Sequence, residues 1–429
     1  MVVFWFRRDL RISDNTALRE AFASGEKVLP VFIFDKNILD ELPKDDARVT
    51  FIMSLLHDIN KDLKQYNTLL AVFYDEPEAV YKKLLTKHSD LIALYANRDY
   101  EPYARKRDKA IYEMLAEHNI PFKSFKDQVI FEKNEVVKDN GEPYVVYTPY
   151  KNRWHQKFKE LTIRVHHMDL KPENFVSHDY PSLTLKDIGF IESAIKPVLY
   201  DVSSSLVEGY EGTRNFPAID GTSHLSPYLR FGAVSIRQIV KSALAAKNQT
   251  FLNELVWREF FMQILWHYPH TVTQAFRPKY DNVKWLYNEA EFKAWCEGKT
   301  GYPIVDAGMR ELNATGFMHN RVRMITASFL CKHLLIDWRK GEAYFAEKLL
   351  DYEQSSNVGN WQWAAGSGVD AAPYFRIFNP SEQVKKFDKD LQYIKKWVPE
   401  FQDAGYMPIV DHKEARERAL RVYKEGVNQ

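Results

Sequence analysis

The sequence has 429 residues, of which 45% are apolar and 27% are charged, and its formal net charge is +1. This length accommodates two or three domains, and the near-zero charge excludes a uniformly basic body that coats nucleic acid, so any anion-binding surface must be a local patch. The two cysteines exclude a disulfide framework or a cysteine-ligated iron–sulfur cluster, which favours a reducing, cytoplasmic setting. No apolar run is long enough for a signal peptide or a membrane span.

Residues 1–131 are predicted to form an α/β domain. Continuous apolar runs are typical of parallel strands buried on both faces, and they occur at residues 2–6, 28–34, 69–74 and 91–96. Gly25 is expected to end a first helix, and a second helix is expected where apolar residues recur at helical spacing: Val49, Ile52, Met53, Leu56, Ile59 and Leu63. Together these elements predict a doubly wound, Rossmann-like parallel sheet. The first strand is followed by RRDLR, so a glycine-rich dinucleotide turn is not expected there.

The remaining chain is predicted to be a linker followed by a helical domain. Residues 132–200 are polar, irregular and interrupted by prolines, as expected of an interdomain connection. Residues 201–429 carry no strand pattern, and their helical windows lie at 235–247, 250–268, 321–338 and 342–352. The fold class is therefore predicted to be α/β plus all-α.

Residues 352–368, YEQSSNVGNWQWAAGSG, have neither helical nor strand period. This segment places Trp361 and Trp363 among three glycines and two asparagines, directly after the carboxylates of Asp351 and Glu353. We expect irregular chain here, with glycines that let the backbone approach another group closely.

Three further motifs could carry chemistry. The hydroxyl-rich run 221–226 precedes a predicted helix and suits phosphate oxygens, although a plain N-cap explains it equally. Glu254 and Trp257 share one helix face that suits a flat heterocycle, or else Trp257 is a core residue. In MHNRVRM, Asn320, Arg323 and Met324 share a face, while Arg321 could meet phosphate or be solvated. No His or Cys cluster has metal-ligand spacing, so no metal is expected.

In this order the motifs resemble the photolyase/cryptochrome family. The resemblance runs from FRRDLRISDN at Phe6 to APYFRIFNP at Ala372, and its strongest parts are GKTGYPIVDAGMRELNATGFMHNRVRMITASFL and WQWAAGSGVDAAPYFRIFNP. Within the family, the chain is most similar to class I photolyases that split cyclobutane pyrimidine dimers. The resemblance implies an enzyme of light-driven DNA repair, in which photo-excited FADH⁻ gives an electron to a flipped-out dimer, splits it into two pyrimidines and recovers the electron.

The resemblance also implies residues for the flavin side of the site. Asn357 would face flavin N5, where a neutral amide lets the reduced anion persist, and Asp351 would pair with Arg323. Electrons would pass to the surface through Trp361, Trp338 and Trp285 in that order. The implied FAD contacts are Tyr210, Thr222, Ser223, His224, Leu225, Ser226, Arg323, Asp351, Glu353 and Asn357. Glu353 departs from the Asp that is usual in the family.

The substrate side follows from the same resemblance. Trp257 would stack on the flipped-out dimer, Glu254 and Asn320 would hydrogen-bond its edge, and Asn357 and Met324 would complete the catalytic site. The implied DNA contacts are Arg214, Glu254, Trp257, Asn320, Arg321 and Gln383. Phe317 stands where several relatives carry Trp. The expected partner is UV-damaged DNA, bound by a monomer that needs no protein partner and no membrane.

Two alternatives to this function are a cryptochrome-type blue-light photoreceptor and a six-four photoproduct photolyase. Asn357 argues against the first, as does the short stretch of 49 residues after Pro380. Asn320 and Met324 argue against the second, because six-four enzymes carry histidines near this motif. A second, antenna chromophore is also implied. Tyr103 and Ala104 stand where folate-binding relatives have Asn and Glu, which leaves a deazaflavin, methenyltetrahydrofolate, a second flavin or nothing.

Overall fold

The computed structural model describes residues 1–428, and their packing divides the chain into two units. Unit 1 consists of Met1–Glu132, Phe158–Tyr200 and Leu225–Ala245. Unit 2 consists of Lys133–Lys157, Asp201–His224 and the chain from Ala246 onward. The chain therefore passes between the units more than once, and each unit is described by itself below.

Unit 1 is built on a five-stranded parallel sheet with the order β3-β2-β1-β4-β5. The strands are β1 (Val2–Phe6), β2 (Val28–Asp35), β3 (Ala71–Asp75), β4 (Ala93–Asn97) and β5 (Phe122–Phe125). In the central register, Val3 pairs with Leu29 on one side and with Leu94 on the other. The predicted strands and the doubly wound fold are confirmed. The edge strand β5 was not predicted, because its four residues, FKSF, include Lys and Ser and so form no continuous apolar run.

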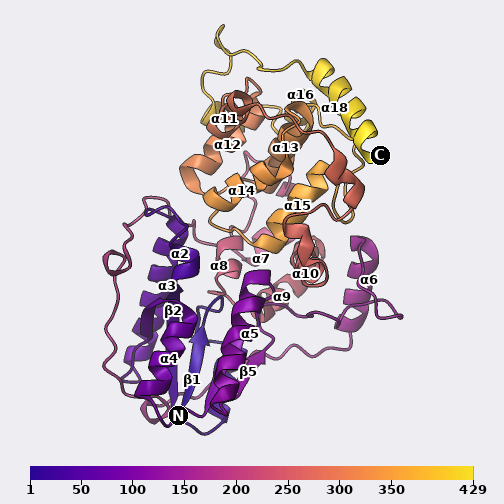
Figure 1. The fold of residues 1–429 in the computed structure, drawn as a ribbon. Coiled ribbons are helices and arrows are strands. Elements are labelled where there is room, and N and C mark those ends of the chain that lie inside the picture. The colour runs from indigo at the N-terminus through magenta and orange to yellow at the C-terminus, as the bar shows by residue number, and fades with distance from the viewer. Residues whose placement is uncertain (429) are drawn as a thin grey trace. The chain divides into compact units, whose positions relative to one another are not determined.

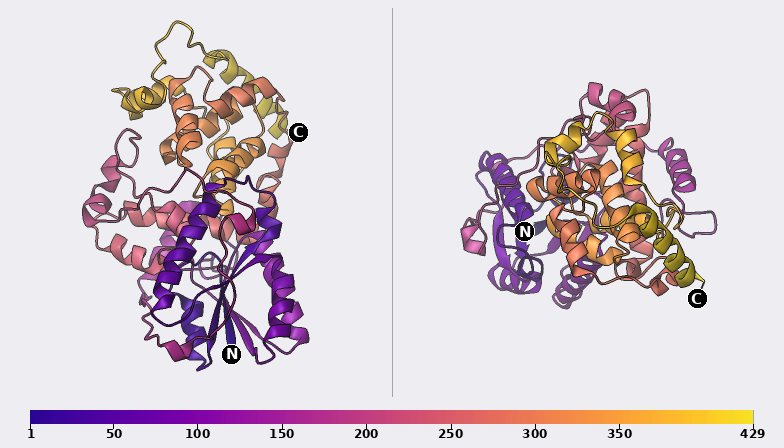
Figure 2. Two further views of the ribbon diagram at one scale, coloured as in Figure 1. Left: turned by 90° about the vertical axis from the view of Figure 1, so that its left-hand side faces the viewer. Right: turned by 90° about the horizontal axis from the view of Figure 1, so that it is seen from above.

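Helices lie on both faces of this sheet (Figures 1 and 2). Those of unit 1 are α1 (Thr16–Ala23), α2 (Lys36–Leu39), α3 (Ala47–Lys64), α4 (Pro77–Lys87), α5 (Pro102–Glu117), α8 (Ser226–Arg230) and α9 (Ile236–Leu244), with 3₁₀ turns η1 (Pro172–Asn174) and η2 (Lys186–Ile188). The core on one face joins Val3 and Trp5 of β1 to Tyr81 of α4 and Ile111 of α5. As predicted, Gly25 follows the first helix with a left-handed φ of +78°.

A buried ionic network ties α9 to the N-terminal part of unit 1. Arg237 of α9 donates from Nε to Asp14 at 2.9 Å and from Nη2 to Asp127 at 2.8 Å. Arg11 donates from Nη2 to the other carboxylate oxygen of Asp127 at 2.6 Å. Asp14 and Asp127 are 0% and 1% exposed, so these carboxylates depend on their arginine partners for charge compensation.

Every regular element of unit 2 is helical within the described residues. The α-helices are α6 (Tyr147–Phe158), α7 (Ser204–Thr213), α10 (Thr250–His267), α11 (Glu289–Glu297), α12 (Pro303–Thr315), α13 (Asn320–Ser328), α14 (Trp338–Lys348), α15 (Gln354–Ala365), α16 (Pro380–Phe387), α17 (Gln392–Trp397) and α18 (His412–Val427). Shorter elements are the 3₁₀ turns η3 (Pro269–Val272) and η4 (Pro278–Asn282) and the π-helical segment η5 (Phe329–His333). This confirms the predicted helical region.

The segment expected to be irregular, 352–368, is mostly the helix α15, so that prediction is wrong. The helix buries residues all around, including Val358, Trp361 and Gln362, and therefore shows no single apolar stripe. Gly359 lies inside the helix, where a Cβ would come within 2.3 Å of the Phe261 ring. Gly366 ends the helix with a left-handed φ of +90°. These glycines serve helix packing and capping.

The packing also differs from the predicted boundaries 1–131, 132–200 and 201–429. The expected linker contains the helix α6, whose aromatic residues Tyr147, Tyr150 and Trp154 are buried at helical spacing. Trp154 donates Nε1–H to Glu259 of α10 at 2.6 Å, so α6 belongs to unit 2. Residues 225–245 instead join unit 1 through the network around Arg237. The functional roles of the predicted domains stay predictions.

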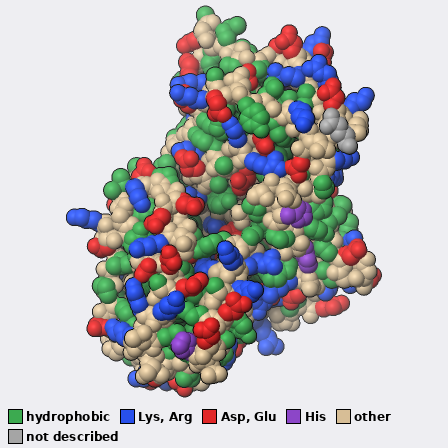
Figure 3. Space-filling model, viewed as in Figure 1, with side chains coloured by type: hydrophobic (Ala, Val, Ile, Leu, Met, Phe, Trp, Pro, Cys, Tyr) green, Lys and Arg blue, Asp and Glu red, His purple; other side chains and the backbone are tan. Residues whose placement is uncertain are grey.

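On the face drawn in Figure 3, Lys and Arg side chains lie interspersed with Asp and Glu, in keeping with the net charge of +1. None of the helices described between residues 1 and 428 is long and apolar enough to cross a membrane.

Candidate functional site

The C-terminal end of α7 connects two of the predicted site helices. Arg214 donates from Nη1 to Glu254 of α10 at 2.5 Å, and the neighbouring Asn215 accepts from Arg321 of α13 at 2.7 Å. Burial raises the pKa of Glu254, and Arg214 opposes that shift. The predicted dimer-binding carboxylate is thus paired with the predicted DNA-binding Arg214, and the residue after Arg214 bonds to Arg321.

One face of the Trp257 ring is covered by Tyr147 of α6. Their ring centroids are 3.5 Å apart and the planes differ by 8°, a parallel stack. Trp257 itself stays partly exposed, and Glu254 lies one turn earlier on α10. The predicted Glu254–Trp257 face therefore exists, and it has an aromatic backing that sequence reasoning missed.

The predicted pairing of Arg323 with Asp351 is present. Arg323 donates from Nη1 and Nη2 to the two carboxylate oxygens at 3.1 and 2.9 Å, a bidentate arrangement. Its Nε also donates to the backbone carbonyl of Met318 at 2.7 Å, which fixes the plane of the guanidinium. The pair joins α13 to the chain just before α15.

Several cationic side chains converge near the start of α13. Burial, together with Arg323, Arg321, His224 and Arg214, lowers the pKa of His319 to about 4. The neutral ring caps α13, since Nδ1 accepts from Arg321 N–H at 3.2 Å, so the hydrogen resides on Nε2. That buried nitrogen has no hydrogen-bond partner among the described residues. A site with this donor and several arginines nearby fits an anionic cofactor such as FAD, whose diphosphate is negatively charged.

The amide of Asn357 on α15 is oriented by Glu342 of α14. Its Nδ2 donates to the backbone carbonyl of Glu342 at 3.1 Å and to the Glu342 carboxyl Oε1 at 2.9 Å. Both N–H groups are therefore turned toward α14, and the amide oxygen is left to accept from a ligand. Burial raises the pKa of Glu342, and its hydrogen bond from Asn357 opposes this.

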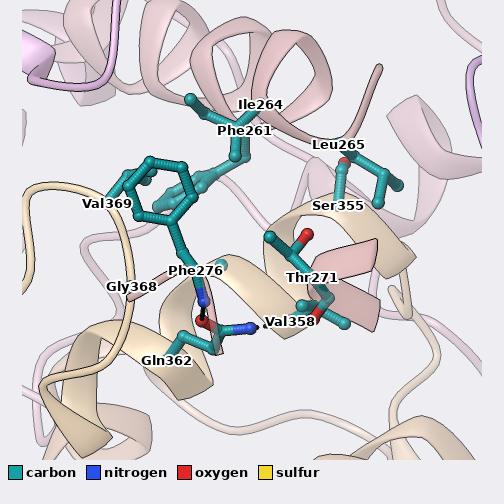
Figure 4. A pocket seen from close by; sticks show the side chains of 11 residues that line it. Phe261, Ile264, Leu265, Thr271, Phe276, Ser355, Val358, Gln362, Gly368 and Val369 are labelled. Carbon is teal, nitrogen blue, oxygen red and sulfur yellow. Dashed lines mark hydrogen bonds between the residues drawn. The ribbon is translucent and has the colours of Figure 1, made fainter. Parts of the chain in front are cut away.

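Glu353, which departs from the usual Asp of the family, is turned toward α10. Its carboxylate lies 3.2 Å from Arg258 Nε, and the two side chains are 7% and 11% exposed. A small cavity lies between α10 and α15, with Ser355, Phe261 and Gln362 among its lining residues (Figure 4). Its volume of about 10 Å³ has room for roughly one water molecule, so a flavin ring does not fit there.

The three tryptophans of the predicted electron path belong to one apolar cluster. Trp361 and Trp338 are 2% and 1% exposed, and the partly exposed Trp285 packs against the same cluster. Burial sets Trp285 apart as the outermost of the three but does not order Trp361 and Trp338. Trp361 also contacts Trp295, at a ring-centroid distance of 6.1 Å. The electron-transfer role itself stays a prediction.

The expected phosphate-binding run 222–226 is divided between the units. The hydroxyls of Thr222 and Ser223 make no hydrogen bond to the described residues and are free to meet a ligand. His224 adopts a φ of +48°, contacts the Phe317 ring at a centroid distance of 4.9 Å, and pairs with Asp220 at 2.9 Å. Leu225 is buried and Ser226 begins α8, both in unit 1.

The other predicted residues lie around Arg321. Asn320 is exposed at the first position of α13, and Met324 Sδ lies 3.5 Å from Arg321 Nη1. The Arg321 guanidinium lies 4.4 Å from the ring centroid of Phe387 on α16, the helix that also carries Gln383. Tyr210 of α7 packs edge-on against Phe251 at 5.2 Å, and burial, with Glu254, raises its pKa to about 12. These residues all belong to unit 2.

Sequence reasoning missed Tyr147, Glu342 and Arg258, each of which holds a predicted site residue in place. Tyr147 carried a usable signal, because it repeats with Tyr150 and Trp154 at helical spacing. Glu342 and Arg258 carried no such signal, since local periodicity does not connect them to their partners Asn357 and Glu353. No group of three or more His, Cys, Asp or Glu in the described part of the chain could hold a metal ion. In unit 1, Tyr103 donates to Asp35 at 2.6 Å and Ala104 is buried.

Known proteins resemble the chain over nearly its whole length. A family model described as DNA photolyase matches residues 2–171, and the FAD binding domain of DNA photolyase matches residues 251–407. A deoxyribodipyrimidine photo-lyase of Alkalihalophilus pseudofirmus is 37% identical, with 98% of this chain and 97% of that protein covered.

Two solved structures carry the same fold. A class III photolyase from Agrobacterium tumefaciens has a TM-score of 0.88 and 34% identity, covering 100% of this chain and 98% of that one. An archaeal photolyase from Sulfolobus tokodaii has a TM-score of 0.87 and 35% identity, covering 99% of each chain. The latter was solved with two FAD molecules, with the implication of a novel light-harvesting cofactor.

Proposed function

Because the chain belongs to the DNA photolyase family, we propose that it is an enzyme that uses light to split cyclobutane pyrimidine dimers in UV-damaged DNA. The observation that carries the proposal is the composition of one unit. Unit 2 holds an amide positioned by Glu342, a bidentate Arg323–Asp351 pair, and an aromatic face beside Glu254. The first two suit a reduced flavin, and the last suits an extrahelical base.

When bound, reduced FAD supplies the light-driven electron, and the side chains position the reactants. Arg323 and Asp351 offer paired charges to the polar edge of the ring, and Asn357 presents its amide oxygen to a ring N–H. Trp257 stacks on the flipped-out pyrimidines, while Glu254 and Asn320 hydrogen-bond their edges. Arg214, Arg321 and Gln383 contact the DNA strand. These roles are proposed together with the FAD contacts at Tyr210, Thr222, Ser223 and His224.

The deciding experiment is blue-light repair of an oligonucleotide with one defined thymine dimer by purified protein. We expect restored thymines under light and none in the dark. Repair of a six-four photoproduct in place of the dimer would support the six-four alternative. A protein that binds FAD and responds to light but repairs neither lesion would support the photoreceptor alternative. Asn357, Asn320 and Met324 favour dimer repair over both.

Replacing Glu254 with Ala is expected to weaken binding and repair of dimer-containing DNA by roughly 5- to 150-fold, which corresponds to about 1–3 kcal/mol for a lost hydrogen-bond partner. FAD content should not change, because Glu254 is placed on the substrate side. Titrating dimer and undamaged oligonucleotides measures the effect. Glu254→Gln keeps the side-chain shape while removing the charge that pairs with Arg214. It therefore separates the contribution of the charge from that of the hydrogen bond to the base. Loss of FAD from Glu254→Ala would show that this helix face lies on the cofactor instead.

Replacing Trp361 with Phe is expected to block photoreduction of oxidised flavin and to leave dimer repair intact once the flavin has been reduced chemically. Trp361 is buried among Trp295, Phe345 and Gly341, not on the substrate face. Flavin absorbance during illumination measures photoreduction. Trp397→Phe is the matched control, since Trp397 packs against the same apolar cluster outside the proposed path. Equal loss of repair in the pre-reduced Trp361→Phe protein would contradict the assigned role.

Further properties are proposed for the chain. A second chromophore in unit 1 is supported by the two FAD molecules of the Sulfolobus tokodaii relative, and absorbance of the chromophores released from purified protein would identify it. The free cysteines Cys296 and Cys331 support a cytoplasmic location. The assignment to class I and the monomeric state remain proposals, the latter open to sedimentation measurements.

A further inference from the structure

We propose that Tyr147 is a positioning residue that holds the indole of Trp257 in place to receive a flipped-out pyrimidine on its other face. The inference rests on the proposed function, in which Trp257 stacks on the dimer. It adds a residue from α6 to the substrate-binding machinery, although the sequence pattern of that region indicated only a linker.

The ring geometry carries the inference. At a centroid separation of 3.5 Å and an angle of 8°, the phenol ring lies flat on the indole and closes one of its two faces. Phe260 meets the indole edge-on at 5.6 Å, and Phe261 lies beside it at the same centroid distance. Trp257 stays partly exposed although Phe261 is also inclined by only 26° to its plane, so an added aromatic layer can stack only on what the face opposite Tyr147 leaves open.

Tyr147 is itself rigidly held. It is 7% exposed, its hydroxyl donates to the backbone carbonyl of Asn253 at 2.7 Å, and its backbone N–H donates to Asp370 at 3.4 Å. Burial raises the pKa of Tyr147, with Glu254 adding to the shift and Arg214 opposing it. The phenol thus remains a neutral donor at physiological pH, so its anchor to α10 persists.

This anchoring matters for binding because a base gains stacking energy only on a ring that is already oriented. An indole free to change its χ angles must be ordered when the base arrives, and that ordering reduces affinity. The hydroxyl of Tyr147 bonds to Asn253, one residue before Glu254 and one turn before Trp257. Tyr147 therefore fixes the indole relative to the carboxylate that is expected to read the edge of the same base.

The test measures dissociation constants for oligonucleotides with and without a dimer in Tyr147→Leu, Tyr147→Met and Tyr147→Phe proteins. We expect dimer binding to weaken by roughly 10-fold with Leu and Met, the scale of a lost aromatic stack, and to be only partly restored with Phe, which keeps the ring but lacks the hydroxyl that anchors it to Asn253. Affinity for undamaged DNA and FAD content should stay unchanged. Tyr150→Leu is the matched control, because Tyr150 is a buried tyrosine of the same helix that packs on Phe260.

A double-mutant cycle separates positioning from general packing. In a Trp257→Ala background, Tyr147→Leu should have no further effect on dimer binding, because its effect acts through the indole. An equal loss in that background, or in Tyr150→Leu, would overturn the inference. So would tighter dimer binding by Tyr147→Leu, since Tyr147 would then block the stacking site. If the parent protein fails to prefer dimer DNA, the proposed function fails as well. If the parent prefers it and Tyr147→Leu keeps that preference, only the role of Tyr147 is rejected.

Discussion

Replacing Asn357 with Asp is expected to abolish dimer repair while the protein still folds and binds FAD. The new carboxyl group would lie within hydrogen-bond distance of the Glu342 carboxyl, where Asn357 Nδ2 lies 2.9 Å from Oε1. Two carboxyl groups this close share a proton, so one of them becomes an acid. If ionised instead, a carboxylate ~4 Å from an anionic ring would repel it by roughly 4 kcal/mol at an effective dielectric of 20. Either outcome disfavours the fully reduced flavin on which repair depends.

Absorbance of the flavin during illumination under reducing conditions, followed by the repair assay, measures this effect. Asn357→Ala and Asn357→Ser are the controls, because they remove the amide without adding an acid, and a milder loss is expected from both. Glu342→Gln in the Asn357→Asp background removes the shared proton but leaves a carboxylate beside the ring, so repair should stay lost. An Asp variant that holds fully reduced flavin and repairs dimers like the parent would remove the main argument for repair over photoreception.

Replacing Arg237 with Met is expected to destabilise unit 1 by about 3–5 kcal/mol, the cost of breaking a buried ion pair on one side. Asp14 would be left without its guanidinium partner, and Asp127 would keep one of its two arginine partners, Arg11, together with its hydrogen bonds from Thr16. Urea unfolding at neutral pH, followed through protection of the backbone amides of unit 1 from hydrogen exchange, measures the change. Arg19→Met is the matched control, because Arg19 pairs with Glu20 on the surface and exposed pairs contribute at most about 1 kcal/mol.

The same network predicts how stability depends on pH. Burial favours the neutral form of Asp127, but Arg11 and Arg237 outweigh it and hold its pKa below the ordinary value. A depressed folded-state pKa stabilises the protein above the unfolded value of about 3.9, and this contribution is lost as the pH falls through the folded value. The Arg237→Met protein should begin to lose stability at a higher pH than the parent. Identical acid-unfolding curves would show that the network is not coupled to folding.

The parts of the fold that sequence patterns predicted are those in which burial is uniform or one-sided. Strands β1, β2 and β4 are buried along their whole length and β3 is buried in part, and all four appear as apolar runs, while α3 carries a clear apolar stripe. The helix α15 shows no stripe because it is covered on several sides, with Gly359 seated against Phe261. The helix α6 was not predicted because the region around it is polar and contains prolines, although its buried aromatic residues recur at helical spacing.

The predicted site residues came from a family resemblance, whereas their supports came only from the structure. The contact of Asn357 with Glu342 spans 15 residues, and that of Tyr147 with Asn253 spans 106. Local periodicity carries no information about such pairs, because tertiary packing alone brings them together. The residues next to Glu342 in the sequence also do not mark it as a hydrogen-bond acceptor for another part of the site. Sequence patterns therefore cannot predict how an amide or an indole of the site is oriented.

The placement of Arg237 has a consequence for the order in which the chain folds as it is synthesised. All five strands of the sheet have been made by residue 125, yet Asp127 depends on an arginine 110 residues further along the chain. Until residues 225–245 leave the ribosome, the negative charges of the carboxylates beside the nascent sheet are not fully compensated by arginine. By then, segments 133–157 and 201–224 have also emerged, still without their partners beyond Ala246. Although nascent domains generally fold in order from the N-terminus, the two units of this protein must complete their folding in overlap.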